Sequence, residues 1–108
     1  MSADDELVLV LCTVPDEATA QKLAEGLVEE RLAACVNAIP GLTSVYRWQG
    51  KVEIDTETQL LIKTRRGRFD ELAAWIKANH PYDVPEIVAL AAEQVSDSYL
   101  AWVLKQTS

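Results

Sequence analysis

Histidine, cysteine and basic residues are all scarce in this chain of 108 residues. It has one histidine, two cysteines and 10 lysine and arginine residues against 17 aspartate and glutamate residues, and its formal net charge is −7. The cysteines do not form the C-x-x-C pair that heavy-metal chaperones need. Nucleic acid is not an expected partner, because phosphate binding depends on lysine and arginine. The composition therefore argues against both of these classes of protein.

Long apolar segments are also missing. No run approaches the roughly 20 apolar residues that cross a bilayer, and the first residues are polar and acidic, unlike a targeting segment. Hydrophobic residues make up 49% and charged residues 25% of the chain, as in ordinary globular proteins. We expect a single domain over residues 1–108, with reduced cysteines, a cytoplasmic location and no membrane partner.

Hydrophobic periodicity predicts an alternation of strands and helices. Leucine and valine dominate a first strand, and apolar residues recur at helical spacing after Asp16, which can cap the helix. Asp97 is expected to cap a short last helix. The predicted elements are a strand at 7–13, a helix at 16–31, a strand at 34–48 bent at Pro40-Gly41, a strand at 52–64, a helix from 69 to Pro81, a strand at 84–95 and a helix after 97.

This order predicts an α+β fold, a ferredoxin-like β-α-β-β-α-β sandwich with an extra C-terminal helix. Both main helices should cover one face of a four-stranded antiparallel sheet, and the fourth strand carries apolar residues on both of its faces. An uncovered apolar face usually marks an interface, so we expect an oligomer. The second and third strands turn at Gln49-Gly50 into a long β-hairpin arm, which we expect to pair with a neighbouring subunit.

Two short segments hold most of the residues that suit recognition. The first, Asn79–Glu86, reads N-H-P-Y-D-V-P-E and lies between the second helix and the fourth strand. Its two prolines restrict the backbone while side chains remain exposed. The second, Ser44–Glu53, reads S-V-Y-R-W-Q-G-K-V-E and places aromatic and charged residues around the hairpin turn. We expect the two segments to meet in one site.

Together with three other strings, these segments resemble the CutA family of divalent-cation tolerance proteins. The other strings are L-C-T-V-P-D-E-A-T-A-Q at 11–21, L-A-A-C at 32–35 and S-Y-L-A-W at 98–102, and the resemblance runs from about Val8 to Val103. It implies a small homotrimer, similar in architecture to the nitrogen-regulatory PII proteins. It also implies a role with copper or another divalent cation.

The resemblance implies metal ligands at Cys12, Asn79 and His80. The first position of the family's histidine pair is Asn79 here, and an amide oxygen is a poor ligand for copper or zinc. An alternative interpretation is structural. Cys12 lies in an apolar strand, where burial makes a thiol inert. His80 ends a helix, where the helix dipole favours it.

The resemblance also implies ligand clefts between neighbouring subunits. The matching residues are Trp48, Lys51, Lys63, Tyr82, Glu86, Tyr99 and Trp102. Lysines suit an anionic group, Glu86 suits a hydrogen-bond donor and the aromatic rings suit a flat or apolar moiety. Packing is the alternative interpretation: Tyr99 and Trp102 in the core, and Trp48 and Lys51 at an interface. Because Lys63 interrupts an apolar run, we expect it to pair with Glu86.

Catalysis has little support in the sequence. No serine or cysteine stands in a nucleophile motif, and Glu53, Asp55 and Glu57 alternate along one strand face as a solvated row would. Residues 13–19 contain no glycine, which excludes the phosphate loop of acylphosphatases. We therefore expect a sensor or adaptor that binds a metal or small ligand. The alternatives are a small-molecule enzyme that uses Lys63 and Glu86, and a purely structural trimer that docks another protein.

Overall fold

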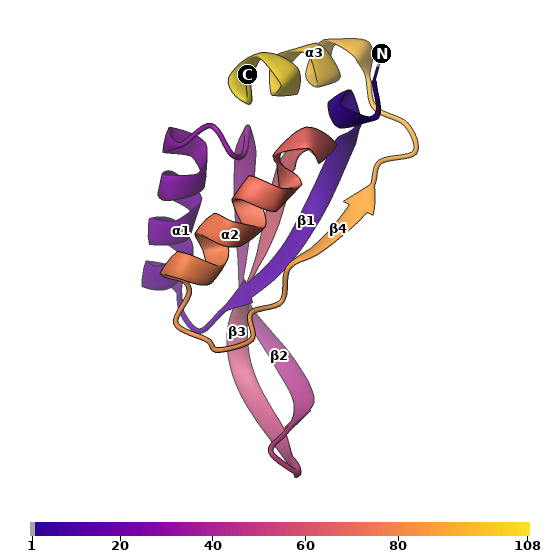
Figure 1. Ribbon diagram of the computed structural model, residues 1–108. Helices are drawn as coiled ribbons and strands as arrows, with labels where there is room; N and C mark the ends of the chain where they lie inside the picture. The colour runs from indigo at the N-terminus through magenta and orange to yellow at the C-terminus, as the bar shows by residue number, and fades with distance from the viewer. Residues whose placement is uncertain (1) are drawn as a thin grey trace.

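The computed structural model describes residues 2–108 and has the predicted α+β architecture (Figure 1). The four strands form one antiparallel sheet in the order β2-β3-β1-β4, as in a ferredoxin-like sandwich. No helix within residues 2–108 is both long and apolar enough to span a membrane. The elements are η1 (Ala3–Asp5), β1 (Leu7–Val14), α1 (Glu17–Glu29), β2 (Cys35–Trp48), β3 (Lys51–Arg65), η2 (Arg66–Arg68), α2 (Phe69–Asn79), β4 (Val88–Ala91) and α3 (Asp97–Gln106).

One face of the sheet carries the main hydrophobic core. Every second residue of β1, from Val8 to Val14, is at most 2% exposed and packs in one core with residues of α1 and α2. These two helices cover this face of the sheet in Figure 1. The strand period of two directs these residues to the same side. As predicted, Asp16 caps α1, where its carboxylate accepts a 2.7 Å hydrogen bond from the Thr19 N–H.

The opposite face of the sheet is mostly open. Leu9 and Leu11 point to this side and are partly exposed, and their register partners Leu90 and Val88 on β4 are 49% and 47% exposed. Helix α3 covers only one end, where Val103 packs with Leu7 and Ala34. The apolar residues of β4 are therefore exposed on both faces in the single chain. Only another protein surface could shield them from water.

Three details differ from the sequence prediction. Strand β4 spans four residues instead of 84–95, because it pairs only with β1 and Pro85 has no N–H to donate. Ser96 caps α3, and Asp97 lies in the first helical turn. Tyr99 and Trp102 are 37% and 42% exposed, so the prediction that they pack in the core is wrong within this chain.

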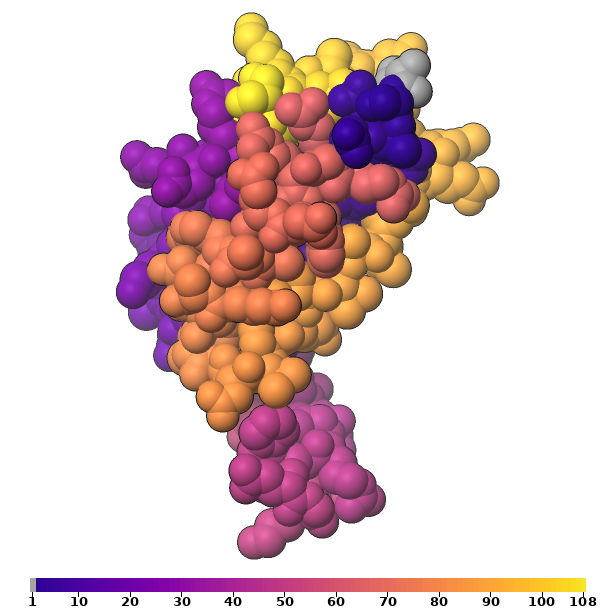
Figure 2. Space-filling view, in the orientation of Figure 1, coloured from indigo at the N-terminus to yellow at the C-terminus, as the bar shows by residue number. Residues whose placement is uncertain are grey.

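The β2–β3 hairpin forms the predicted projecting arm, which stands out from the body in Figure 2. A register shift between Ile39 and Leu42 bends β2 at its base, as Pro40-Gly41 predicted. Gln49 and Gly50 turn the chain with φ of 50° and 80°. One face of the arm is apolar: Val45, Val52 and Ile54 are 63%, 61% and 68% exposed.

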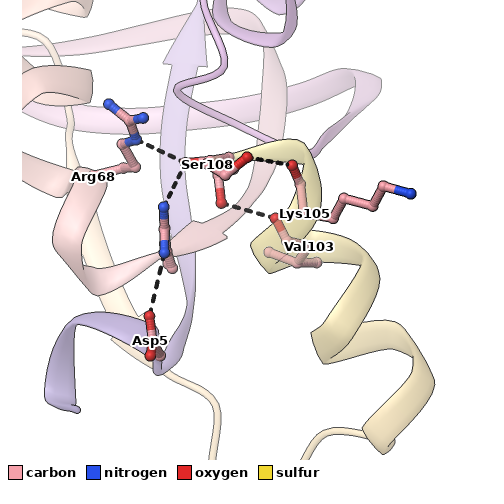
Figure 3. Close-up of polar contacts among 7 residues, drawn as sticks. Asp5, Arg68, Val103, Lys105 and Ser108 are labelled. Carbon is pink, nitrogen blue, oxygen red and sulfur yellow. Dashed lines mark hydrogen bonds and ion pairs between the residues drawn. The ribbon is translucent and has the colours of Figure 1, made fainter. Parts of the chain in front are cut away.

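Arginine side chains hold the C-terminal end of α3 against the sheet. Arg65 and Arg68 donate hydrogen bonds of 2.8 and 2.9 Å to the Thr107 carbonyl; Figure 3 shows Arg68 beside this end of α3. Arg31 donates to the carbonyls of Lys105 and Gln106. Arg65 also contacts the Asp5 carboxylate at 3.2 Å. Positive charge at a helix C-terminus complements the helix dipole. These contacts fix where α3 presents its exposed aromatic residues.

Gly26 allows α1 and α2 to pack closely. A Cβ atom at this position would lie 2.5 Å from two ring carbons of Trp75 on α2. We expect Gly26→Ala to lower the free energy of unfolding by roughly 1–2 kcal/mol, because displacing the ring outweighs the gain in helix propensity. Chemical denaturation at a fixed protein concentration measures this change.

A double-mutant cycle tests the cause. In a Trp75→Ala background the clash is absent, and Gly26→Ala should then stabilise the protein by about 1 kcal/mol. The same loss in both backgrounds would mean that Trp75 does not require the glycine. Glu25→Ala, an exposed change on the same helix, serves as the control.

Candidate functional site

His80 has a structural position at the end of α2. The residue is 8% exposed, and its Nε2 lies 2.8 Å from the Thr13 carbonyl oxygen at the end of β1. Its Nδ1 accepts a 3.1 Å hydrogen bond from the Tyr82 N–H, so Nε2 carries the proton and donates to Thr13. Both ring nitrogens are therefore used in tying the 80–86 loop to the sheet.

The other two predicted metal ligands are also engaged or buried. Burial raises the pKa of the Cys12 thiol to about 12, with smaller contributions from the negative charges of Glu86 and Glu57. A thiol with this pKa is protonated at neutral pH, whereas the thiolate is the ligand form. The side-chain amide of Asn79 donates a 2.8 Å hydrogen bond to the Trp75 carbonyl.

In this arrangement Cys12, Asn79 and His80 do not form a metal site. A structural zinc site needs four ligands and a catalytic site three. No group of three or more histidine, cysteine, aspartate or glutamate side chains within residues 2–108 is close enough to share an ion. The imidazole of His80 has no free nitrogen, and the Cys12 side chain is fully buried.

A cavity of about 660 Å³ opens where the arm leaves the body. The arm forms one wall through Tyr46 and Trp48, the 82–86 loop forms the opposite wall, and Thr13 and Glu57 line the base. The loop takes this path because His80 ties it to β1, and because Pro81 before it and Pro85 within it restrict the backbone. The two segments that the sequence singled out do meet here.

Two tyrosine–carboxylate pairs stiffen this region. The Tyr82 hydroxyl donates a 2.7 Å hydrogen bond to Glu57, and the Tyr46 hydroxyl donates to Asp55. The hydrogen bond to Asp55 raises the pKa of Tyr46 to about 12. Burial, followed by the hydrogen bond to Glu57, raises the pKa of Tyr82 above its ordinary value. Both hydroxyls thus stay protonated and act as donors at physiological pH.

The sequence pattern does not identify Glu57 as a residue of this cavity. It was predicted to belong to a solvated row with Glu53 and Asp55, but it is only 7% exposed. It lies opposite Leu42 at the base of the arm, where the Tyr82 hydroxyl donates a hydrogen bond to it. The alternating pattern of carboxylates does not predict the burial of Glu57, because the loop that covers this residue comes from a distant part of the chain.

The seven predicted cleft residues divide into separate groups within one chain. Trp48, Tyr82 and Glu86 line the cavity, whereas Lys51 lies across the turn from Trp48 at the arm tip. The remaining three belong to the other end of the sheet, near α3: Lys63, Tyr99 and Trp102.

The group near α3 is built around two adjacent aromatic rings, tilted by 34° to one another. The ring centroids of Tyr99 and Trp102 are 5.7 Å apart. Burial raises the pKa of the Tyr99 hydroxyl, and the adjacent Cys35 adds to this effect. Cys35 is the register partner of Lys63, which brings that lysine to the same end of the sheet.

The predicted pair of Lys63 and Glu86 does not form within the chain. The three ion pairs among residues 2–108 are Arg65–Asp5, Arg66–Glu6 and Arg68–Glu71. Lys63 is in register with Leu9, whereas Glu86 precedes β4, whose first residue Val88 is in register with Leu11.

Comparison with known proteins gives one consistent family. Residues 8–106 match the family described as CutA1 divalent ion tolerance protein. The chain is 54% identical over 99 residues to the divalent-cation tolerance protein CutA of Thermus thermophilus, covering 92% of this chain and 96% of that one. It is 48% identical over 100 residues to the chloroplastic protein CutA of Arabidopsis thaliana, of which it spans about half, 55%, while 93% of this chain is covered.

The fold comparison agrees. The crystal structure of CutA1 from Oryza sativa superimposes with a TM-score of 0.94 at 44% identity, covering 99% of this chain and 98% of that one. Sequence and fold match over nearly the whole chain, and the matched region contains both groups of cleft residues. The chain therefore belongs to the CutA1 family of divalent ion tolerance proteins.

Proposed function

We propose that this protein is a cytoplasmic homotrimer that serves divalent-cation tolerance by binding a ligand in clefts between subunits, as a sensor or adaptor without enzymatic turnover. The separation of the predicted cleft residues is the observation that carries this function. Trp48 and Lys51 lie on the arm, whereas Lys63, Tyr99 and Trp102 lie at the opposite end of the sheet. One cleft can combine the two groups only if a neighbouring subunit supplies one of them.

The exposed apolar surface supports assembly. Ile39, Val88 and Leu90 are each about half exposed on the uncovered sheet face, at 49%, 47% and 49%. The arm adds a second apolar surface at Val45, Val52 and Ile54, so both surfaces would face water in an isolated chain. Contiguous apolar surfaces of this kind mark interfaces. A subunit number of three is what the resemblance to the family implies.

The role in tolerance is assigned to the clefts rather than to a resident copper ion. The donors at Cys12 and His80 are buried or already hydrogen-bonded, so a copper site there would require both the core and the 80–86 loop to open. A small-molecule enzyme that uses Lys63 and Glu86 in these clefts would also need both subunits, because one chain holds the two residues apart. It has less support, because the sequence contains no nucleophile motif.

The cytoplasmic location is supported by the thiols. Cys12 and Cys35 are both free, and Cys35 is only partly buried. Free thiols are maintained in reducing compartments.

Assembly through the arm is tested by Ile54→Lys. Ile54 is 68% exposed in the single chain, so the lysine should leave the subunit fold intact while placing a charge in the proposed interface. We expect native mass spectrometry to show three subunits for the parent protein and a shift to single subunits for the variant at low micromolar concentration.

The control for this variant is Gln21→Lys, which adds the same charge at an exposed position of α1, away from the uncovered sheet face. It should keep three subunits. A trimer that persists in Ile54→Lys with unchanged thermal stability would contradict a role of the arm in assembly.

The state of Cys12 is tested by thiol modification in Cys35→Ser, which leaves Cys12 as the single thiol. Because its pKa is about 12 and its side chain is buried, we expect no reaction with Ellman's reagent at pH 8 until denaturant is added. In denaturant one thiol per chain should react.

Copper titration of Cys12→Ser and of the parent protein completes this test. Equal copper affinity in the two proteins is expected, because the thiol is not a ligand. Rapid modification of Cys12 in the native state, or copper binding that disappears in Cys12→Ser, would instead support a metal site at this position.

A further inference from the structure

Lys63 places a positive charge on the uncovered face of the sheet. Along β3 it alternates with Ile62 and Thr64, which are fully buried on the other side, so the lysine points away from α1 and α2. Its register partner Leu9 is one of the apolar residues of the uncovered face. None of the three ion pairs among residues 2–108 includes Lys63. A surface that covers this face must therefore supply a carboxylate, because burying an unpaired ammonium is costly.

Negative charge gathers at the other end of the same face. Glu57, Asp83 and Glu86 line the cavity at the base of the arm, where the described part of the chain places no lysine, arginine or histidine. Glu57 precedes Lys63 on β3 by an even number of residues, so strand alternation puts both on the uncovered side. The carboxylates of the cavity therefore belong to the face that carries the lysine.

The two charges are too far apart to meet within one chain. Lys63 and Leu90 both pair with Leu9, so they are level across the sheet, and Glu86 comes four residues before Leu90. At about 3.3 Å per residue and about 4.8 Å between strands, Lys63 and Glu86 are separated by roughly 13 Å along the strands and roughly 10 Å across them. An ion pair needs a separation of about 4 Å. Only a second copy can bring Glu86 to the Lys63 side chain.

Glu86 is the cavity carboxylate that is available to a second copy. Glu57 already accepts the 2.7 Å hydrogen bond from Tyr82 and is only 7% exposed. Asp83 lies in a bend of the loop, whereas Glu86 precedes Ile87, which packs against the main core. Glu86 is exposed and takes part in none of the three ion pairs among residues 2–108. Its backbone is therefore held in place while its carboxylate has no cationic partner in this part of the chain.

Each charged end of the face also carries exposed aromatic side chains. Tyr99 and Trp102 lie at the end that holds Lys63 and are 37% and 42% exposed. Trp48 lies at the end that holds Glu86 and is 42% exposed. A head-to-tail contact, in which the α3 end of one copy meets the arm end of the next, covers both aromatic groups and brings opposite charges together. Repeated around a closed ring, this contact uses each end of every subunit once.

We propose that Lys63 of one subunit forms an ion pair with Glu86 of the partner subunit. The pair selects the head-to-tail contact and joins the two halves of the cleft in a fixed register. Apolar residues such as Val88 and Leu90 do not define this register, because their contacts are not directional, whereas charge pairs are specific. This assignment rests on the proposed assembly and names the residues by which one copy recognises the next.

Charge exchange tests the pair. Lys63→Glu and Glu86→Lys each set like charges against one another at the contact, and the double variant restores opposite charges. At the guanidinium chloride concentration that half-dissociates the parent trimer, we expect each single change to raise the dissociation constant at least about tenfold. The double variant should return to within about threefold of the parent. Size-exclusion chromatography with light scattering measures the subunit number across a protein dilution series.

Glu25→Lys, the same charge change at an exposed position of α1, is the control, and adding it to Lys63→Glu should not restore the trimer. Single variants that assemble as tightly as the parent trimer would overturn the pair and leave the assembly in place. A double variant as weak as the single variants would do the same. A parent protein that stays a single subunit would overturn the assembly and the pair together.

Zero-length cross-linking locates the contact. A carbodiimide joins a lysine amine to a carboxylate only when the two groups are in contact. In a trimer assembled from an equal mixture of unlabelled and isotope-labelled chains, we expect linked peptides that join Lys63 to Glu86 and combine a labelled with an unlabelled partner. A trimer in which Lys63 is linked to other carboxylates, and not to Glu86, would overturn the assignment.

Discussion

One-sided burial of the sheet is the constraint on which the rest of the structure depends. The core residues of β1 alternate with residues on the opposite face, and α1 and α2 cover only the first set. The strand period thus divides the same strands into a dry face and an exposed apolar face. Assembly is the physical way to cover the second face and the apolar side of the arm without changing the fold of the chain.

A second constraint is the buried imidazole of His80. A buried polar ring needs partners for both nitrogens, and here the partners are the carbonyl at the end of β1 and the backbone of the following loop. This places Tyr82 over Glu57, so the residue that resembles a metal ligand instead positions one wall of the cavity at the base of the arm.

Most of the fold could be predicted because its signals are local. The cap at Asp16, the bend at Pro40-Gly41 and the turn at Gln49-Gly50 each depend on a few neighbouring residues. The errors have a different origin. Strand β4 was predicted too long because its apolar run does not show where its only partner, β1, stops pairing with it. The same apolar periodicity that buries Val103 leaves Tyr99 and Trp102 exposed, because α3 covers only one end of the sheet.

The sequence by itself determined the order of elements, the arm and the two segments that meet at its base, since periodicity, caps and turn residues act over short distances. Only the tertiary structure decided which side chains share a site. It buried Glu57 beneath a loop that begins more than twenty residues later, separated Lys63 from Glu86, and engaged both nitrogens of His80. These outcomes follow from strand register and loop path, which bring distant residues together and leave no trace in local sequence pattern.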